Sequence, residues 1–398
     1  MLDRNHCLAL DAADPLRAFR EEFVLPEGVV YLVGNSLGAL PRGTSERVRR
    51  TVEDEWGGRL VGGWNQAGWY EMPLRLGDRL APLIGAGPGQ VVVGNTTSIA
   101  IFQALAAALR LRQDRRVIVS DASNFPTDHY VAQGLARLLG GYEVRDVSEG
   151  RFDDAAVVLL SEVDYRTGAR RDVPAVTAAV QAAGALMIWD LCHSVGALQV
   201  DVSQADLAVG CTYKYLNAGP GAPAFLYVNP RHHDTAENVL SGWHGHAEPF
   251  AFEAGYRPAE GIRRFAVSTP HIVSFAALDA ALDVWERVPM DQVRAKSKAL
   301  TSLFVDLVGD ALELVSPADA EERGSQVSFR HPDGYPVMRA LIDRGVHGDF
   351  RAPDVLRFGF APLYIRYADV YDAAATLREV LDKELWRDER YAQRLAVT

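Results

Sequence analysis

From about residue 90 onward, short apolar runs rich in β-branched residues alternate with stretches of helical length. This alternation constrains the fold most, because strands that alternate with helices form a mostly parallel sheet covered on both sides. Several runs are apolar throughout, as expected of strands buried on both faces. Strands are predicted at residues 91–93, 117–119, 157–160, 186–189, 207–209 and 225–228. Helices are predicted at residues 98–111, 127–139 and 173–183.

The chain has 398 residues, more than one hydrophobic core usually supports, so a large domain and a smaller one are expected. After residue 289 the pattern changes, and it predicts long helices at 291–312 and 368–385 and short strands at 327–329 and 356–358. We therefore expect a large domain over residues 61–288 and a small α+β domain over residues 289–398. Residues 1–60 do not follow the alternation and are predicted to be an arm that packs with the small domain.

Composition and charge exclude several classes of protein. The net charge is −11 and the arginine pairs are scattered, which argues against a nucleic-acid partner. No apolar run approaches the roughly 18 residues of a membrane span, and the N-terminus lacks the apolar stretch of a secretory signal. The three cysteines, Cys7, Cys192 and Cys211, have no metal-type spacing. We expect a cytoplasmic protein with inert thiols, no metal site and no membrane contact.

A lysine lies at the predicted carboxyl edge of the sheet. Lys214 closely follows the strand predicted at 207–209 and precedes a turn rich in glycine and proline. Ligand sites of such sheets lie at that edge, where an amine nucleophile can meet a bound aldehyde. Taken alone, the pattern is also that of an exposed lysine before a loop.

A second motif has an acid at the end of an apolar strand and a histidine three residues later. Asp190 ends the run at 186–189, and His193 follows. A carboxylate there can keep the ring nitrogen of pyridoxal 5′-phosphate (PLP) protonated, so that the ring accepts the electrons of a carbanion. An N-cap for Asp190 and a structural role for His193 are the alternatives. Asp190 and Lys214 are 24 positions apart, enough for one strand-to-strand step, so the two residues are expected to face each other across the cofactor.

Two further segments support a cofactor site. Residues 94–98 supply backbone amides and hydroxyls at the start of a helix, where a phosphate binds well. The same residues also suit an ordinary capped helix. Residues 124–128 offer an aromatic face for stacking on a cofactor and a second acid. The alternative is that they form an ordinary capped turn before a helix.

Six strings in this sequence resemble those of the kynureninase family in order and spacing. They are GNSLG (34–38), FPTDHY (125–130), WDLCHSVGA (189–197), GCTYKYLNAGPGAPAF (210–225), SGWHGH (241–246) and RFGFAPLY (357–364). The resemblance covers nearly the whole chain. It implies the α/β fold of PLP-dependent transferases, fold type I, with a mostly parallel seven-stranded sheet between helices and a small α+β C-terminal domain.

Carried over position by position, the resemblance implies roles for the residues around the cofactor ring. Lys214 would carry PLP covalently and move the protons. Asp190 would pair with the pyridine nitrogen, with Asp128 beside it, and His193 would lie close to the cofactor. Phe125 would stack on the ring.

The resemblance also implies how the phosphate is held. Thr97, Ser98 and Tyr213 would bind the phosphate, and Ser161 would contact the cofactor from a strand end. Tyr213 is in addition a candidate proton donor in the later steps of the reaction.

The remaining implied positions concern the substrate and a second subunit. Arg357 matches the arginine that binds the substrate's α-carboxylate, and Asn35 and Ser36 match the substrate end of the pocket. Trp243 and Thr269 match positions that reach a cofactor site from the partner subunit, which implies a homodimer.

The implied activity is the hydrolysis of L-kynurenine to anthranilate and L-alanine, in tryptophan catabolism and NAD biosynthesis. Thr269 stands where some animal members have asparagine, which favours L-kynurenine over 3-hydroxykynurenine. Cys192 and Val195 stand where small residues such as alanine are common. The alternatives are another fold type I enzyme, such as a cysteine desulfurase or an aminotransferase, and a PLP-binding protein without turnover.

Overall fold

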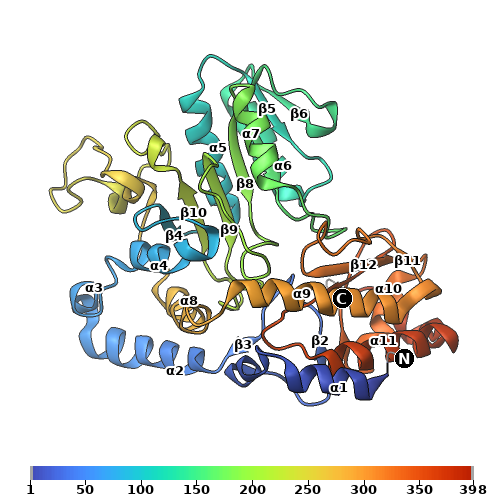
Figure 1. The fold of residues 1–398 in the computed structure, drawn as a ribbon. Helices are drawn as coiled ribbons and strands as arrows, with labels where there is room; N and C mark the ends of the chain where they lie inside the picture. The colour runs from blue at the N-terminus through green and yellow to red at the C-terminus, as the bar shows by residue number, and fades with distance from the viewer. Residues whose placement is uncertain (1–2, 396–398) are drawn as a thin grey trace.

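A seven-stranded sheet forms the centre of the large domain. The computed structural model describes residues 3–395, and Figure 1 shows the sheet rising from a base of helices. Its strand order is β4-β10-β9-β8-β7-β5-β6. Only β10 runs opposite to its two neighbours; the other strands of this sheet are parallel to one another. The strands are β4 (Val91–Gly94), β5 (Val117–Ser120), β6 (Glu143–Asp146), β7 (Ala155–Ser161), β8 (Leu186–Asp190), β9 (Leu207–Cys211) and β10 (Ala224–Val228).

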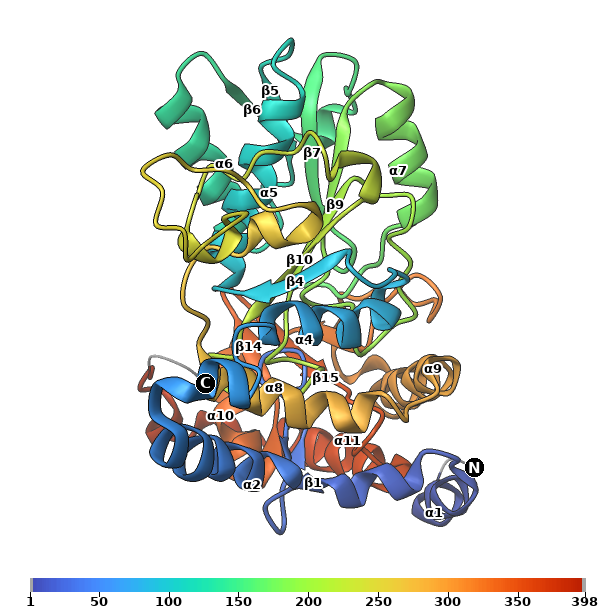
Figure 2. The ribbon, with the colours of Figure 1, turned by 90° about the vertical axis from the view of Figure 1, so that its left-hand side faces the viewer.

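Helices cover both faces of this sheet, as Figure 2 shows with α5 and α6 on one side and α7 on the other. They are α5 (Thr97–Leu111), α6 (Pro126–Leu139) and α7 (Val173–Ala182). Along β7, Val157 and Leu159 pack into the cluster under α5, whereas Val158 and Leu160 pack on the opposite side. Successive side chains of a strand point to opposite faces, so a run that is apolar throughout is buried twice.

The small domain contains an antiparallel sheet of order β11-β12-β15-β14. Its strands are β11 (Glu313–Leu314), β12 (Gln326–Arg330), β14 (Asp349–Arg351) and β15 (Val355–Gly359). Its helices are α9 (Met290–Val308), α10 (Gly334–Ile342) and α11 (Tyr367–Asp382). No helix within residues 3–395 is long and apolar enough to cross a membrane.

The N-terminal segment lies along the base of the molecule, and α1 (Arg4–Ala13) runs beside α11 (Figure 1). The Asp11 carboxylate accepts hydrogen bonds from the first backbone amides of α11 at 2.6 and 3.1 Å. Further along, β2 (Val30–Tyr31) pairs in parallel with β13 (Val346–His347). The strands β1 (Phe23–Val24) and β3 (Leu40–Pro41) pair antiparallel and complete this segment.

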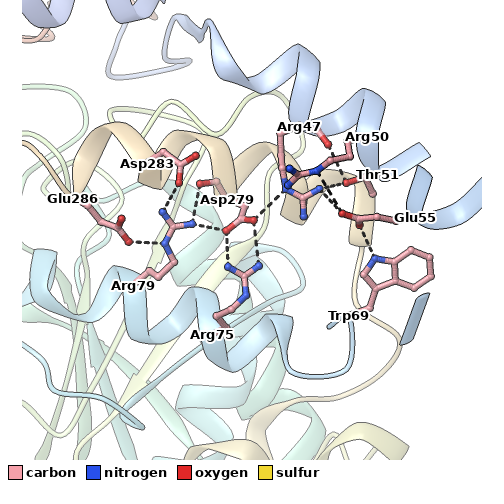
Figure 3. A network of polar contacts seen from close by, with 10 residues as sticks. All are labelled: Arg47, Arg50, Thr51, Glu55, Trp69, Arg75, Arg79, Asp279, Asp283 and Glu286. Carbon is pink, nitrogen blue, oxygen red and sulfur yellow. Dashed lines mark hydrogen bonds and ion pairs between the residues drawn. The ribbon is translucent and has the colours of Figure 1, made fainter. Parts of the chain in front are cut away.

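A charged network joins the end of this segment to the large domain (Figure 3). Asp279, on α8 (Ile272–Trp285), receives hydrogen bonds from Arg47 of α2 (Gly43–Arg50) and from Arg75 and Arg79 of α4 (Met72–Leu80). Its side chain is only 13% exposed. Three guanidinium groups around one shielded carboxylate fix the three helices more firmly than isolated surface pairs would.

The strands and helices predicted from the sequence are confirmed, and the differences have local causes. Strand β6 was not predicted, because Glu143, Arg145 and Asp146 break the apolar pattern at an edge strand. The helix predicted at 291–312 ends earlier, at Val308, because Gly309 adopts a positive φ of 53° that terminates it.

Candidate functional site

A cleft of about 410 Å³ opens where the carboxyl ends of the central strands meet the small domain. The ends of β7, β8 and β9 supply its floor, and the start of α5 supplies one wall. Arg351 and Arg357 of the small domain and Asn35 and Ser36 of the N-terminal segment also line it. The cleft therefore gathers residues from all parts of the chain at the edge where parallel sheets bind ligands.

Lys214 enters this cleft from the loop after β9. Its Nζ lies 2.8 Å from Nε2 of His193. Burial and the positive charge of Lys214 lower the pKa of His193 well below its usual value, so the neutral imidazole accepts a hydrogen bond from the ammonium group. The other ring nitrogen of His193, Nδ1, is buried and finds no hydrogen-bond partner among residues 3–395.

The GNSLG turn packs directly on the lysine loop. The backbone N–H of Gly38 donates to the Tyr213 carbonyl at 2.8 Å. A Cβ at Gly38 would lie 2.2 Å from the Lys214 carbonyl oxygen and 2.8 Å from Cα of Asn217. Glycine is therefore required at position 38 for this close approach of two backbones.

Lys214 differs from the other lysines of the chain in its surroundings. The sequence contains four lysines, at positions 214, 296, 298 and 383. The other three form ion pairs outside the cleft, with Asp14, Glu321 and Glu379 respectively. Lys214 alone lines the cleft, so it is the one ε-amine positioned to react with an aldehyde bound there.

Two carboxyl groups lie together on the floor of the cleft. Asp190 accepts a hydrogen bond from the Cys192 backbone N–H at 2.8 Å, and its other oxygen lies 3.2 Å from the Ser161 hydroxyl. Burial and the neighbouring Asp190 raise the pKa of Asp128, which is hydrogen-bonded to Asp190. The proton of the pair is therefore favoured on Asp128.

An anion site is formed where α5 begins. Thr96, the residue before the helix, makes no capping hydrogen bond through its side chain within the described chain. The amides and hydroxyls at Thr97 and Ser98 are thus available to an anion at the positive end of a 15-residue helix. Phe125 also lines the cleft, and its ring stands edge-on to Tyr165 at a centroid distance of 5.4 Å.

These features fit PLP. An ionised acid, an amine, a helix start for the phosphate and an aromatic wall surround one cavity, and this set matches the polar groups of the cofactor. The unpaired Nδ1 of His193 is typical of a site in which a ligand completes the hydrogen bonding.

Arg357 already donates several hydrogen bonds within its own chain. It is 1% exposed, and it donates to both oxygens of Asp349, to the Tyr165 carbonyl and to the Ser36 hydroxyl. Four of its five N–H groups are thus engaged. This arrangement leaves Arg357 one N–H for a substrate.

Sequence reasoning missed the neighbours that complete this end of the cleft. Arg351 lines the cleft with its side chain 33% exposed, and its Nη2 lies 3.3 Å from Asp349. The alternation of side chains along β14 offered a signal. Asp349 pairs with Arg357 in the sheet, and Arg351 lies two residues after Asp349, on the same face of the strand. Asn35 is buried and donates to Gln326 at 2.7 Å.

Trp243 and Thr269 do not line the cleft of their own chain. Trp243 stacks on His244 and also contacts the rings of Trp64, Tyr70 and Phe250. Thr269 lines a separate small cavity beside α5.

Comparisons with known proteins agree with the architecture and the site. The chain is 52% identical to a kynureninase from Burkholderia pseudomallei (strain 1106a), over all of both sequences. It is 53% identical to a kynureninase from Deinococcus radiodurans, covering 96% of this chain and 97% of the relative. Residues 293–377 match the model of the kynureninase C-terminal domain.

Solved structures with lower sequence identity share the fold. A cysteine desulfurase from Thermococcus onnurineus superposes with a TM-score of 0.76 at 19% identity, covering 92% of this chain and 98% of that one. A cysteine desulfurase from Escherichia coli gives a TM-score of 0.74 at 18% identity, with the same coverage. Full-length identity to the curated kynureninases, rather than this shared fold, identifies the family. The chain belongs to the kynureninase family.

Proposed function

We propose that this protein is a PLP-dependent kynureninase, which hydrolyses L-kynurenine at the Cβ–Cγ bond to give anthranilate and L-alanine. The observation that carries the proposal is the meeting of Lys214 and the Asp190–Asp128 pair in one cleft, in a chain of this family. The chemistry that PLP supplies when bound is an electron sink for the bonds broken at the substrate's carbon atoms.

Different residues of the cleft would bind different parts of the cofactor. Lys214 would carry it covalently, and Asp190 would pair with its ring nitrogen and keep that nitrogen protonated. Thr97 and Ser98 receive the phosphate at the start of α5. Ser161 and His193 contact the cofactor from the ends of neighbouring strands, and Phe125 covers the ring.

Proton transfers fall to Lys214 and Tyr213. Lys214 removes the proton from the substrate's α-carbon and returns it, because its Nζ is the one amine in the cleft. Burial and the nearby Cys211 raise the pKa of Tyr213 above its usual value, so its phenol keeps its proton at neutral pH. Tyr213 can therefore donate a proton in the later steps and a hydrogen bond to the phosphate.

The substrate's carboxylate is placed at the small-domain end of the cleft. Arg351 and Arg357 face a single acid there, Asp349, which leaves one net positive charge for one carboxylate. Ser36 connects the two arginines: its hydroxyl lies 3.1 Å from Nη2 of Arg357 and 3.5 Å from Nη2 of Arg351. Asn35 completes this end of the pocket.

The carboxylate assignment predicts a change in the Michaelis constant. Arg357→Ala should raise KM for L-kynurenine at least about tenfold, because a charge-assisted hydrogen bond contributes roughly 1.5–3 kcal/mol. Arg357→Lys should substitute poorly, since lysine cannot hold Asp349 and the Tyr165 carbonyl together. Steady-state kinetics of the two variants measure this. An unchanged KM in Arg357→Ala would mean that Arg357 serves only its ion pair with Asp349.

Product analysis tests the proposed reaction against the other reactions of this fold. Purified protein with PLP should form anthranilate and alanine from L-kynurenine in equal amounts. A cysteine desulfurase would instead release sulfur from L-cysteine, and an aminotransferase would form a keto acid. The absence of anthranilate, with either of those products present, would refute the proposal.

The active form is proposed to be a homodimer with composite sites. Trp243 and Thr269 are predicted to act at the partner's cofactor, and the fact that neither lines the cleft of its own chain supports this. Near Trp243, Phe250 and Phe252 are 66% and 86% exposed. Such apolar exposure is typical of a surface that a second subunit covers.

Complementation tests the shared sites. Lys214→Ala and a variant disabled at Trp243, each inactive alone, should regain roughly a quarter of wild-type activity when unfolded and refolded together. In the hybrid dimer one site collects both defects and the other has none. If each subunit supplied its own Trp243, every hybrid site would be defective and no activity would return.

Location and domain limits complete the proposal. We place the protein in the cytoplasm on the sequence grounds given above. The domain limits stay as predicted: an arm over residues 1–60, a large domain over 61–288 and a small domain over 289–398. The pairing of β2 with β13 and the contact of α1 with α11 support the placement of the arm.

A further inference from the structure

Two of the three cysteines lie side by side under the cofactor cleft. Strands β8 and β9 are parallel neighbours, with Asp190 opposite Val209. The pairing continues past β8, where the Leu191 N–H donates to the Val209 carbonyl at 2.8 Å. Cys192 lies in the turn that follows β8, and Cys211 is the last residue of β9.

The two cysteines pack against each other. The Cys211 Sγ lies 3.8 Å from the Cys192 carbonyl oxygen, and each thiol shifts the pKa of the other. The Cys211 side chain therefore lies directly beside Cys192.

The pair is reachable and is connected to the catalytic floor. Cys192 lines the cleft, whereas Cys211 is 1% exposed beneath it. The Cys192 backbone N–H is the donor that holds Asp190, at 2.8 Å. A covalent change at Cys192 would thus act one hydrogen bond away from the acid assigned to the pyridine nitrogen.

Local charges favour one sulfur of the pair as the nucleophile. Burial raises the pKa of Cys211, but the hydrogen bond to Cys192 and the charge of Lys214 outweigh it, so the net pKa is lowered. The pKa of Cys192 moves in the opposite direction, because its hydrogen bond to Cys211 and its burial both raise it. A thiolate beside a thiol is the reactive arrangement for disulfide formation.

We propose that Cys192 and Cys211 form an oxidation site, closing to an intramolecular disulfide when hydrogen peroxide enters the cleft. The Cys192 sulfur, which lines the cleft, attacks one peroxide oxygen and breaks the O–O bond. The departing hydroxide takes up the thiol proton as water, and a sulfenic acid remains on Cys192. The Cys211 sulfur then displaces the sulfenic hydroxyl, which leaves with the Cys211 proton as water, and the S–S bond forms. Together the two thiols lose two protons and two electrons, and the peroxide is reduced to two water molecules.

The oxidation site is coupled to the cofactor site. Peroxide reaches Cys192 through the cleft that PLP is proposed to fill, so bound PLP should slow formation of the disulfide. By the same linkage, the disulfide should weaken retention of PLP, because it constrains the segment that holds Asp190. This coupling concerns the cofactor and not the choice of substrate, so it does not depend on which reaction the protein catalyses.

Thiol counting and peptide mapping test the proposal. The full-length protein, with PLP bound and after PLP removal, is treated with hydrogen peroxide, blocked and denatured. Free thiols should fall from three to one, with a cross-linked 192–211 peptide two hydrogen atoms lighter than its parts and restored by dithiothreitol. The cross-link should form at least several-fold faster without PLP. Three free thiols in both forms would overturn the site, and equal rates in both forms would overturn the coupling.

Two variants act as matched controls. Cys192→Ala removes one sulfur of the pair, and peroxide should then give no disulfide that involves Cys211. Cys7→Ala removes the third thiol, in α1 and far from the cleft, and the 192–211 cross-link should form at the wild-type rate. A cross-link that contains Cys7 would contradict the proposal.

Discussion

Replacing Lys214 with alanine should lower the rate of L-kynurenine cleavage by at least about a thousandfold, at the upper end of the range for loss of a general acid–base group. The variant loses both the covalent attachment of the cofactor and the one amine of the cleft. Its neighbour His193 cannot substitute, because an imidazole cannot form the covalent attachment and because burial lowers the pKa of His193, which makes it a weak base. Anthranilate fluorescence measures the rate, and absorbance measures the attached cofactor.

Lys298→Ala is the matched control for that prediction. Lys298 is paired with Glu321 on the surface of the small domain, so its removal should leave both rate and absorbance unchanged. A Lys214→Ala variant that keeps more than a tenth of the wild-type rate would contradict the assigned role of Lys214.

Replacing Asp190 with asparagine should leave PLP bound but reduce turnover about a hundredfold or more, because an amide cannot hold the pyridinium proton. The second acid of the pair provides a sharp comparison. Burial and the neighbouring Asp190 raise the pKa of Asp128, so Asp128→Asn replaces the acid of the pair that is more readily protonated. We expect a much smaller loss for Asp128→Asn, measured as kcat at saturating L-kynurenine. Equal losses in the two variants would contradict separate roles for the two acids.

The fold could be predicted largely from local pattern. The strands from β7 to β10 are apolar throughout, and that pattern fixes both their identity and their burial. The edge strand β6 could not be predicted in this way, because three of its four residues are charged. An apolar pattern reveals strands that are buried on both faces, and it does not reveal an edge strand rich in charged residues.

The candidate site, too, could be predicted from the sequence only in part. Lys214 and Asp190 could be predicted because each follows a buried strand, and parallel strand ends meet at one edge. The raised pKa of Asp128 could not, because it depends on the distance of Asp128 from Asp190 in the folded chain. Likewise Asp349 reaches Arg357 across two strands of the small domain. That pairing occupies two N–H groups of Arg357 that could otherwise bind a substrate.

The central claim is that PLP is held on Lys214 in the cleft between the two domains. Reduction of the protein–PLP complex with borohydride fixes the cofactor to its amine, and peptide mapping then identifies the residue. The small number of lysines makes the outcome unambiguous, because the other three are ion-paired outside the cleft. We predict one label per chain, on Lys214. A label on Lys296, Lys298 or Lys383, or no label in protein that cleaves L-kynurenine, would contradict this account.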